Sequence, residues 1–231
     1  MNNKKRIIYG LLLTFVVFAV STILGRKLIW QSDFIPSSFM THMLMLVLSI
    51  GLIWGMKNNV NYRIATPKFK QSLRPVLFGF LAAVIVNLFL GMLTIAISGK
   101  TDAHPAVANA SVLQFLLFDL ILASVAEEFL FRGFLLNLLK PLKTKCFTIF
   151  KRNISVSVLI SALVFGLAHL ILIASGVGAL FVVRMVTFTF VLGLIAGYYQ
   201  EKYNNHAFAI LVHMAGNLMG VFGILLSGVG S

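Results

Sequence analysis

Three ionisable side chains interrupt an apolar run in the stretch SVAEEFLFRGFLLNLL, residues 124–139. Glu128 and Arg132 are four positions apart, so on a helix they lie on one face and can form an ion pair. Glu127 points about 140° away from Arg132, because successive helical residues turn by about 100°. One carboxylate can therefore be neutralised within its own helix while its neighbour stays available for chemistry.

Two later apolar runs carry side chains that could complete a site with Glu127. The stretch SALVFGLAHL places Phe165 and His169 one helical turn apart, and AILVHMAGNL does the same for His213 and Asn217. A buried carboxylate beside an imidazole can hold a water molecule and accept its proton. An imidazole and a carboxamide one turn apart can donate hydrogen bonds to a developing oxyanion. Together these groups would hydrolyse a peptide bond.

Each polar pair also has a purely structural interpretation. A buried ion pair can stabilise a helix bundle, and an intramembrane histidine or asparagine can join helices by hydrogen bonds. Phe165 is expected to pack and to position His169. Because three runs each carry a polar pair at helical spacing, the combination favours chemistry. The histidines near predicted helix ends or in loops receive no chemical role; they are His42, His104 and His206.

The elements that must position these residues are membrane helices. The chain of 231 residues is 59% hydrophobic and 11% charged, with a mean hydropathy of +0.98. Its apolar runs are long enough to cross about 30 Å of hydrocarbon, and they are continuous rather than alternating. They lie at 7–25, 39–56, 76–98, 112–139, 154–174, 179–199 and 207–226. We therefore predict an all-α, polytopic transmembrane helix bundle of about seven spans.

The net charge of +13 is distributed by side of the membrane. Lys and Arg residues concentrate before the first run and in the loops after the second and fourth runs, and Lys202 follows the sixth run. This pattern predicts a cytoplasmic N-terminus in an integral, multi-pass protein of the plasma membrane. It also predicts membrane lipids as partners and argues against nucleic acid. The first run is expected to be a retained span; the alternative is a cleaved signal peptide.

The basic stretch 57–75 divides the predicted chain into two parts. Residues 1–75 form a two-helix membrane segment with a basic cytoplasmic loop, and residues 76–231 form a denser membrane-embedded core. The loop at 143–153 is expected to run as a cytoplasmic extension or a surface helix. The one cysteine, Cys146, cannot form an intrachain disulfide.

Two further features concern contacts between the helices of the core. Asp119 and Arg184 are charged residues within spans and are expected to pair across the fourth and sixth helices. Gly193 and Gly197 have the spacing of a small-residue packing face, which we expect near the site.

The three polar motifs, in their order, resemble those of a known family. The segments are EEFLFR at 127–132, FGLAH at 165–169 and HMAGN at 213–217. They follow the family pattern of EExxxR, then FxxxH, then HxxxN or HxxxD, on successive membrane helices. The chain is similar, over about residues 110–220, to the CPBP family of CAAX-processing and bacteriocin-processing intramembrane proteases, also called the Abi family. The resemblance implies an integral membrane endopeptidase, similar to type II CAAX prenyl proteases and located in a bacterial plasma membrane.

The resemblance also implies roles for individual residues. Glu127 and His169 would activate the water, and His213 and Asn217 would stabilise the oxyanion. The supporting residues would be Glu128, Arg132 and Phe165. The alternative cofactor is zinc, held by Glu127, His169 and His213 with one open position. We favour a mechanism without a metal, because the sequence contains no HExxH spacing.

The substrate implied by the resemblance is a peptide or a lipidated protein at the membrane. The sequence does not choose between a prenylated CAAX peptide and a peptide linked to bacteriocin maturation. Two other functions stay open: a non-catalytic membrane immunity or scaffold protein that uses the same polar pocket, and a transporter that uses Glu127 and the histidines as a proton relay. The transporter is disfavoured, because no inverted repeat is evident.

Overall fold

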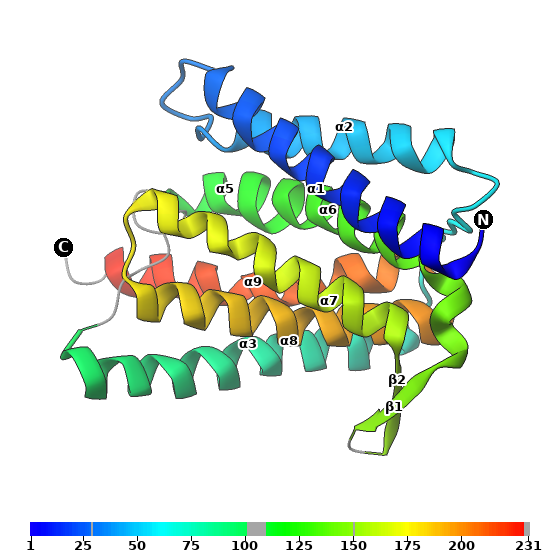
Figure 1. Cartoon of the computed structure of the whole chain (residues 1–231). Coiled ribbons are helices and arrows are strands. Elements are labelled where there is room, and N and C mark those ends of the chain that lie inside the picture. Colours follow the sequence, from blue (N-terminus) through cyan, green and yellow to red (C-terminus); the bar gives the residue numbers. More distant parts are fainter. Residues whose placement is uncertain (29, 101–109, 150, 229–231) are drawn as a thin grey trace.

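The computed structural model describes residues 1–28, 30–100, 110–149 and 151–228. The chain forms a bundle of helices that run roughly along one direction, and in the described ranges there are seven helical segments (Figure 1). They are α1 (Asn3–Lys27), α2 (Phe39–Gly55), α3 (Phe69–Ser98), a composite helix that starts at Val112, α7 (Val156–Ala168), α8 (Ala179–Tyr203) and α9 (Ala207–Gly228). The predicted all-α membrane bundle is confirmed.

In the described ranges, five helices are long and apolar enough to cross a membrane. They are Asn3–Lys27, Phe69–Ser98, Val156–Ser175, Ala179–Tyr203 and Ala207–Leu225. The apolar helix α2 is shorter, with 17 residues. The chain is therefore an integral membrane protein.

The composite helix that carries the two glutamates changes its winding along its length. It consists of α5 (Val112–Gln114), the π-helical η1 (Phe115–Ala123), α6 (Ser124–Glu128) and the π-helical η2 (Phe129–Leu136). Such π-helical turns are rare in proteins, and those that occur are often found at functional sites. Near its end, side chains reach the carbonyl of Arg132, which accepts hydrogen bonds from Asn137 Nδ2 at 2.9 Å and Gln200 Nε2 at 3.0 Å. The Asn137 bond is local, and the Gln200 bond ties the helix to α8.

The start of α3 differs from the prediction. The helix begins at Phe69 rather than near residue 76, so Lys70 and Arg74 lie in its first turns and not in a loop. Hydropathy marks only the apolar part of a helix, whereas lysine, arginine and glutamine are themselves good helix formers. Hydropathy therefore does not detect the polar first turns of α3.

The segment expected as a cytoplasmic extension or a surface helix forms a β-hairpin. A 3₁₀ turn, η3 (Lys140–Thr144), leads into β1 (Cys146–Ile149), which pairs antiparallel with β2 (Arg152–Ser155). Phenylalanine, threonine and isoleucine in these strands favour extended structure, so the surface-helix expectation was wrong. The hairpin projects from the start of α7, at the same end of the bundle as the N-terminus (Figure 1).

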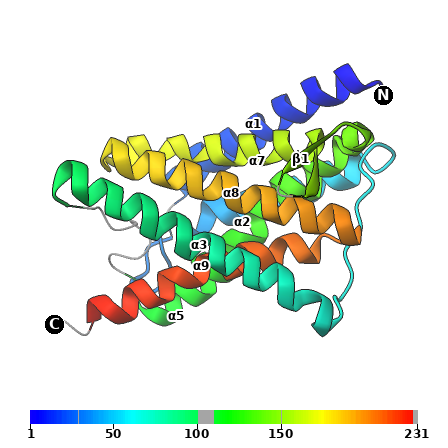
Figure 2. The ribbon, with the colours of Figure 1, turned by 90° about the horizontal axis from the view of Figure 1, so that it is seen from below.

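Small residues allow the helices to approach closely. A Cβ on Gly79 of α3 would lie 2.5 Å from the backbone oxygen of Val212 in α9. On α8, a Cβ on Gly193 would lie 3.1 Å from Ala162, and one on Gly197 would lie 2.9 Å from Val158. The expected small-residue face thus packs α8 against α7, and Figure 2 shows α3 alongside α8 and α9.

The helix pair α1 and α2 packs over the composite helix. Met45 of α2 belongs to one buried cluster with Ala126 and Leu130 of the composite helix and with Phe165 of α7. A Cβ on Gly25 of α1 would collide with the backbone of Thr41 in α2, so these two helices are in close contact. The glutamates therefore lie between the N-terminal helix pair and the rest of the bundle.

Candidate active site

Glu128 and Arg132 form the ion pair expected within one helix. Arg132 Nη1 donates to Glu128 Oε1 at 2.9 Å, and the side chains are 0% and 1% exposed. The guanidinium carbon also lies 4.3 Å from the centre of the Phe165 ring, a cation–π contact. This pair is sealed from solvent, so it cannot itself meet a substrate.

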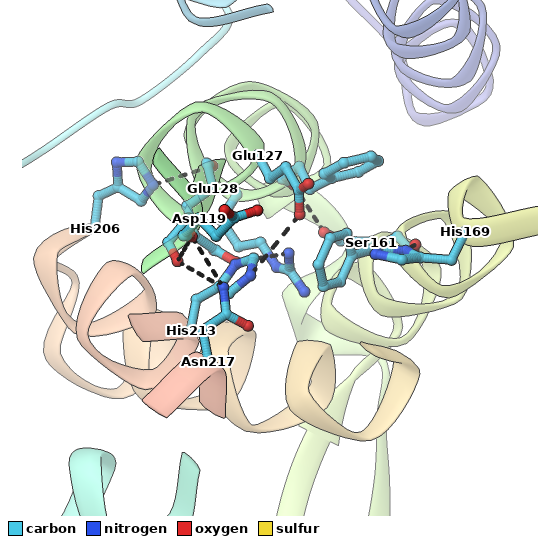
Figure 3. Close-up of polar contacts among 12 residues, drawn as sticks. Asp119, Glu127, Glu128, Ser161, His169, His206, His213 and Asn217 are labelled. Atoms are coloured by element: carbon cyan, nitrogen blue, oxygen red, sulfur yellow. Dashed lines mark hydrogen bonds and ion pairs between the residues drawn. The ribbon is translucent and has the colours of Figure 1, made fainter. Parts of the chain in front are cut away.

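His213 of α9 reaches both carboxylates, as Figure 3 shows. Its Nδ1 lies 2.9 Å from Glu128 Oε1, and its Nε2 lies 3.8 Å from Glu127 Oε2. In the neutral ring, an Nδ1–H that donates to Glu128 leaves a lone pair on Nε2, facing Glu127. Glu128 thereby sets the tautomer of His213.

The two adjacent glutamates differ in exposure. The Glu127 side chain is 18% exposed, against 1% for Glu128. Consecutive helical residues point in different directions, so only one of the two can face Arg132. Glu127 is the carboxylate that water can reach.

Asn217 lies one turn beyond His213 on α9, but its amide is already engaged. Its Nδ2 donates to Ser124 Oγ at 3.0 Å and to the Asp119 carbonyl at 3.3 Å. A carboxamide has two N–H donors. Asn217 must exchange one of these bonds before it can donate to an oxyanion.

His169 lies apart from the glutamates, at the point where α7 tightens into the 3₁₀ turn η4 (His169–Ser175). Its Nδ1 is 3.0 Å from the Phe165 carbonyl. Its ring packs against Phe165 at 5.1 Å between centres, and Phe165 in turn contacts His213 at 5.4 Å. Among the side chains that the structure describes, Glu127 has no hydrogen bond or ion pair with His169, although the two interact electrostatically. The structure brings Glu127 and His213 together and leaves His169 beside Phe165.

Comparison with known protein families shows what the region that contains this site is similar to. Residues 109–219 match a family model described as Type II CAAX prenyl endopeptidase Rce1-like. This similarity supports a CPBP-family protease, and we call residues 109–219 the CPBP region. The match confirms the resemblance and indicates a CAAX-type membrane endopeptidase. Searches of curated proteins and of solved structures gave no significant match.

The CPBP region contains every site residue predicted from the sequence. These are Glu127, Glu128, Arg132, Phe165, His169, His213 and Asn217. Helices α1, α2 and α3 lie outside the matched region. Any side chain that they add to the site comes from beyond the CPBP match.

The predicted zinc ligands do not form a metal site in this arrangement. Within the described part of the chain, no three His, Cys, Asp or Glu side chains are grouped closely enough to hold a metal ion. Both ring nitrogens of His213 face carboxylates, and Phe165 contacts both His213 and His169. Glu127, His169 and His213 therefore do not fit the zinc alternative as they stand.

Two histidines that received no role from the sequence contact the glutamates of the CPBP region. His42 Nε2 lies 3.8 Å from Glu127 Oε1. His206 Nε2 lies 3.1 Å from the carbonyl oxygen of Glu128, and its Nδ1 lies 3.0 Å from the Tyr62 hydroxyl. Both come from loops or helix starts, where hydropathy gives no clue to their direction. His104, also given no role, lies outside the described residues.

The expected ion pair between Asp119 and Arg184 is not formed. No ion pair joins these two residues, both of which the structure describes. Arg184 lies over the Phe181 ring at 4.9 Å and points toward Gly91 of α3. Asp119 instead interacts electrostatically with His42 and Glu127. The π-helical winding of η1, which a regular helical repeat does not anticipate, changes the direction in which Asp119 points.

A cavity of about 790 Å³ lies at the basic end of the bundle. Its lining includes Arg6, Lys57, Tyr62 and Phe129 but neither Glu127 nor His213. The Tyr62 and Phe129 rings pack against His206, whose centre is 5.3 Å and 5.0 Å from theirs. Aromatic side chains therefore stand between this cavity and the buried Glu128.

Proposed function

We propose that the chain is an integral membrane endopeptidase that hydrolyses a peptide bond with a water molecule activated by Glu127. The observation that carries this proposal is the facing pair of Glu127 Oε2 and His213 Nε2, 3.8 Å apart, within the CPBP region. Glu127 is accessible, while the neighbouring Glu128 is neutralised by Arg132.

The spacing of this pair suits one water molecule. A water about 2.8 Å from each atom can span the gap and donate one hydrogen to each acceptor. Its oxygen lone pairs then point away from both side chains, toward an incoming carbonyl carbon. The bond from His213 Nδ1 to Glu128 keeps Nε2 as the acceptor.

The proposed reaction proceeds in two steps. Glu127 accepts a proton as the water oxygen adds to the carbonyl carbon, and the carbonyl oxygen becomes an oxyanion. The C–N bond then breaks, and the amine nitrogen receives the proton from Glu127. We assign oxyanion stabilisation to Asn217, after it releases Asp119 or Ser124. His213 cannot share this expected role in the neutral tautomer set by Glu128, because its Nε2 then accepts from the water and carries no proton to donate.

His169 retains a proposed role as a second imidazole that assists Glu127. Their electrostatic interaction supports this role. Because His169 is bound to the Phe165 carbonyl, a shift of the η4 turn is needed to bring it closer.

The proposed setting follows from the basic residues and from the family. The N-terminus lies in the cytoplasm of a bacterial cell, residues 76–231 form the protease core, and residues 1–75 form the N-terminal segment. The substrate is a membrane-associated peptide or lipidated protein, for which a prenylated CAAX peptide is the first probe. Membrane lipids are partners, and nucleic acid is not.

The decisive experiment replaces Glu127 with glutamine. This change keeps the size of the side chain but removes the base, so the turnover of a prenylated CAAX reporter in proteoliposomes should fall about 10²-fold or more while KM changes little. The matched control is Glu201→Gln, because Glu201 bonds Ser155 Oγ and lies outside the site. Cleavage by Glu127→Gln at the wild-type rate would refute the proposal.

A second arm identifies the substrate in cells. Membrane-peptide termini should differ between cells that carry the wild-type chain and cells that carry Glu127→Gln. Unchanged termini together with an unchanged cellular phenotype would instead support a non-catalytic immunity or scaffold protein.

Chelation separates the two catalytic types. A glutamate-type enzyme should keep full cleavage after treatment with a strong chelator and should contain no stoichiometric zinc. Activity lost on chelation and restored strictly by zinc would establish a metallo-type mechanism.

A further inference from the structure

We infer that His42 of α2 is a further positioning residue of this site. It restrains Oε1 of the Glu127 carboxylate, the oxygen that does not face His213. The inference rests on the proposed function, because it assigns a role in the reaction of Glu127. It also extends the site beyond the CPBP region, which begins at residue 109.

The geometry places the Glu127 carboxylate between two imidazoles. His42 Nε2 lies 3.8 Å from Oε1, and His213 Nε2 lies 3.8 Å from Oε2. The last torsion of a glutamate side chain is broad, so a single partner leaves the carboxylate free to rotate. A partner on each oxygen restricts that rotation and keeps Oε2 directed at His213.

Packing fixes the place of His42. It shares one face of α2 with Met45 and Ser49, which are 2% and 0% exposed. Met45 packs against Ala126 and Leu130, which flank the two glutamates in the composite helix. The imidazole is thus held by the helix contact itself and not by a surface loop.

The second ring nitrogen of His42 supports a functional interpretation. His42 Nδ1 is buried and has no hydrogen-bond partner in the part of the chain that the structure describes. A buried polar atom without a partner is costly, and such atoms concentrate at functional sites. A histidine selected only for packing would be replaced at lower cost by an apolar side chain.

The position of Asp119 gives His42 a second acidic neighbour. Asp119 interacts electrostatically with both His42 and Glu127. The α2 imidazole thus lies among two carboxylates, where it can donate a hydrogen bond to Glu127 directly or through one water. No covalent step passes through His42.

The experiment compares His42→Leu with His42→Gln in the full chain, reconstituted in proteoliposomes, with the prenylated CAAX reporter. Leucine removes every hydrogen-bonding group, whereas glutamine keeps an N–H donor of similar reach. We expect His42→Leu to lower kcat about 10²-fold, the loss typical of a misplaced reacting group, with KM little changed. His42→Gln should recover most of that loss. Val47→Leu is the matched control, since Val47 lies on the same helix and is 59% exposed.

A cycle of stability measurements gives a readout that does not depend on cleavage. The unfolding midpoints of His42→Leu, Glu127→Gln and the double variant should be non-additive if the two side chains interact. If His42→Leu folds poorly, the test uses the more conservative His42→Gln instead. Its kinetics are then compared in the presence and absence of Glu127→Gln.

Three results would overturn the inference. They are wild-type kcat in His42→Leu, a folded His42→Gln that is as slow as His42→Leu, and strictly additive unfolding midpoints. Equal cleavage by wild type and Glu127→Gln would instead refute the proposed function, and the stability cycle would still report whether His42 and Glu127 interact.

Discussion

Removing one partner of the buried Glu128–Arg132 pair should cost more free energy of unfolding than removing both. Arg132 is 0% exposed, and its Nε and Nη2 atoms have no hydrogen-bond partner in the described structure. Glu128 is therefore the main countercharge of a guanidinium that is out of reach of water. Breaking such a buried pair from one side typically costs about 3–5 kcal/mol.

The double variant Glu128→Gln/Arg132→Met leaves no charge uncompensated. It loses the cation–π contact with Phe165, about 1 kcal/mol, and the charge assistance on the His213 bond, again about 1 kcal/mol. We expect a total cost of about 2–3 kcal/mol, whereas independent single losses would sum to about 6–10 kcal/mol. The gap between the expected cost of the double variant and the sum of the two single costs corresponds to at least a 100-fold change in the unfolding equilibrium constant.

The assay is reversible unfolding in mixed micelles titrated with a denaturing detergent and followed by circular dichroism. Each single variant, the double variant and Lys70→Met, an exposed charge deletion on α3, are measured together. Costs that simply add, or single losses as small as that of Lys70→Met, would refute the view that this pair is buried and mutually dependent. The double variant should not cleave the reporter even if it folds, because His213 loses the charged partner that sets its tautomer.

Three further predictions address packing, protonation and the N-terminal helix. Gly193→Val should lower the free energy of unfolding by about 1–3 kcal/mol, because a Cβ at this position meets Arg132 and Ala162. It should also lower the rate of cleavage. Thermal unfolding and the reporter assay test the two effects. Burial lowers the pKa of His206, which lies between α8 and α9, to about 4. The neutral His206 ring therefore contributes to the free energy of unfolding in full above pH 6.5, and this contribution is lost as the pH falls toward 4. The loss is roughly 3 kcal/mol in all. Unfolding measured against pH should show it in wild type and not in His206→Gln. Arg6→Met should cost about 2 kcal/mol, since its guanidinium donates to three backbone carbonyls, two of them in part-buried bonds. The exposed Lys5→Met should cost little, and thermal unfolding compares the two.

Contacts within one helix could be predicted from the sequence, because spacing alone sets them. The bond between Glu128 and Arg132 is the clearest case: four positions on a helix place the two groups one turn apart, and the structure has them at 2.9 Å. The same reasoning correctly left Glu127 free of Arg132. Apolar runs likewise predicted the helices, since their length and continuity depend only on composition.

Contacts between helices could not be predicted in the same way. Nothing in the local sequence indicates that His42 meets Glu127, because 85 positions separate them and the contact depends on how α2 crosses the composite helix. The direction of Asp119 was missed because the π-helical η1 breaks the regular repeat. The expected convergence of His169 on Glu127 depends on a depth along α7 that hydropathy defines only to within about a turn.

The adjacent glutamates explain why the supporting pair matters to a reaction that it does not touch. One position along a helix turns a side chain by about 100°, so Glu128 faces inward to Arg132 and His213 while Glu127 faces His42 and His213. His213 is shared by both carboxylates, and the proton that it gives to Glu128 determines what its other nitrogen offers to Glu127. A change at Glu128 or Arg132 therefore reaches the water-binding edge through the imidazole, even when Glu127 itself is unmoved. A single acidic residue at this place could fix the imidazole or act as the base, and the consecutive pair allows both.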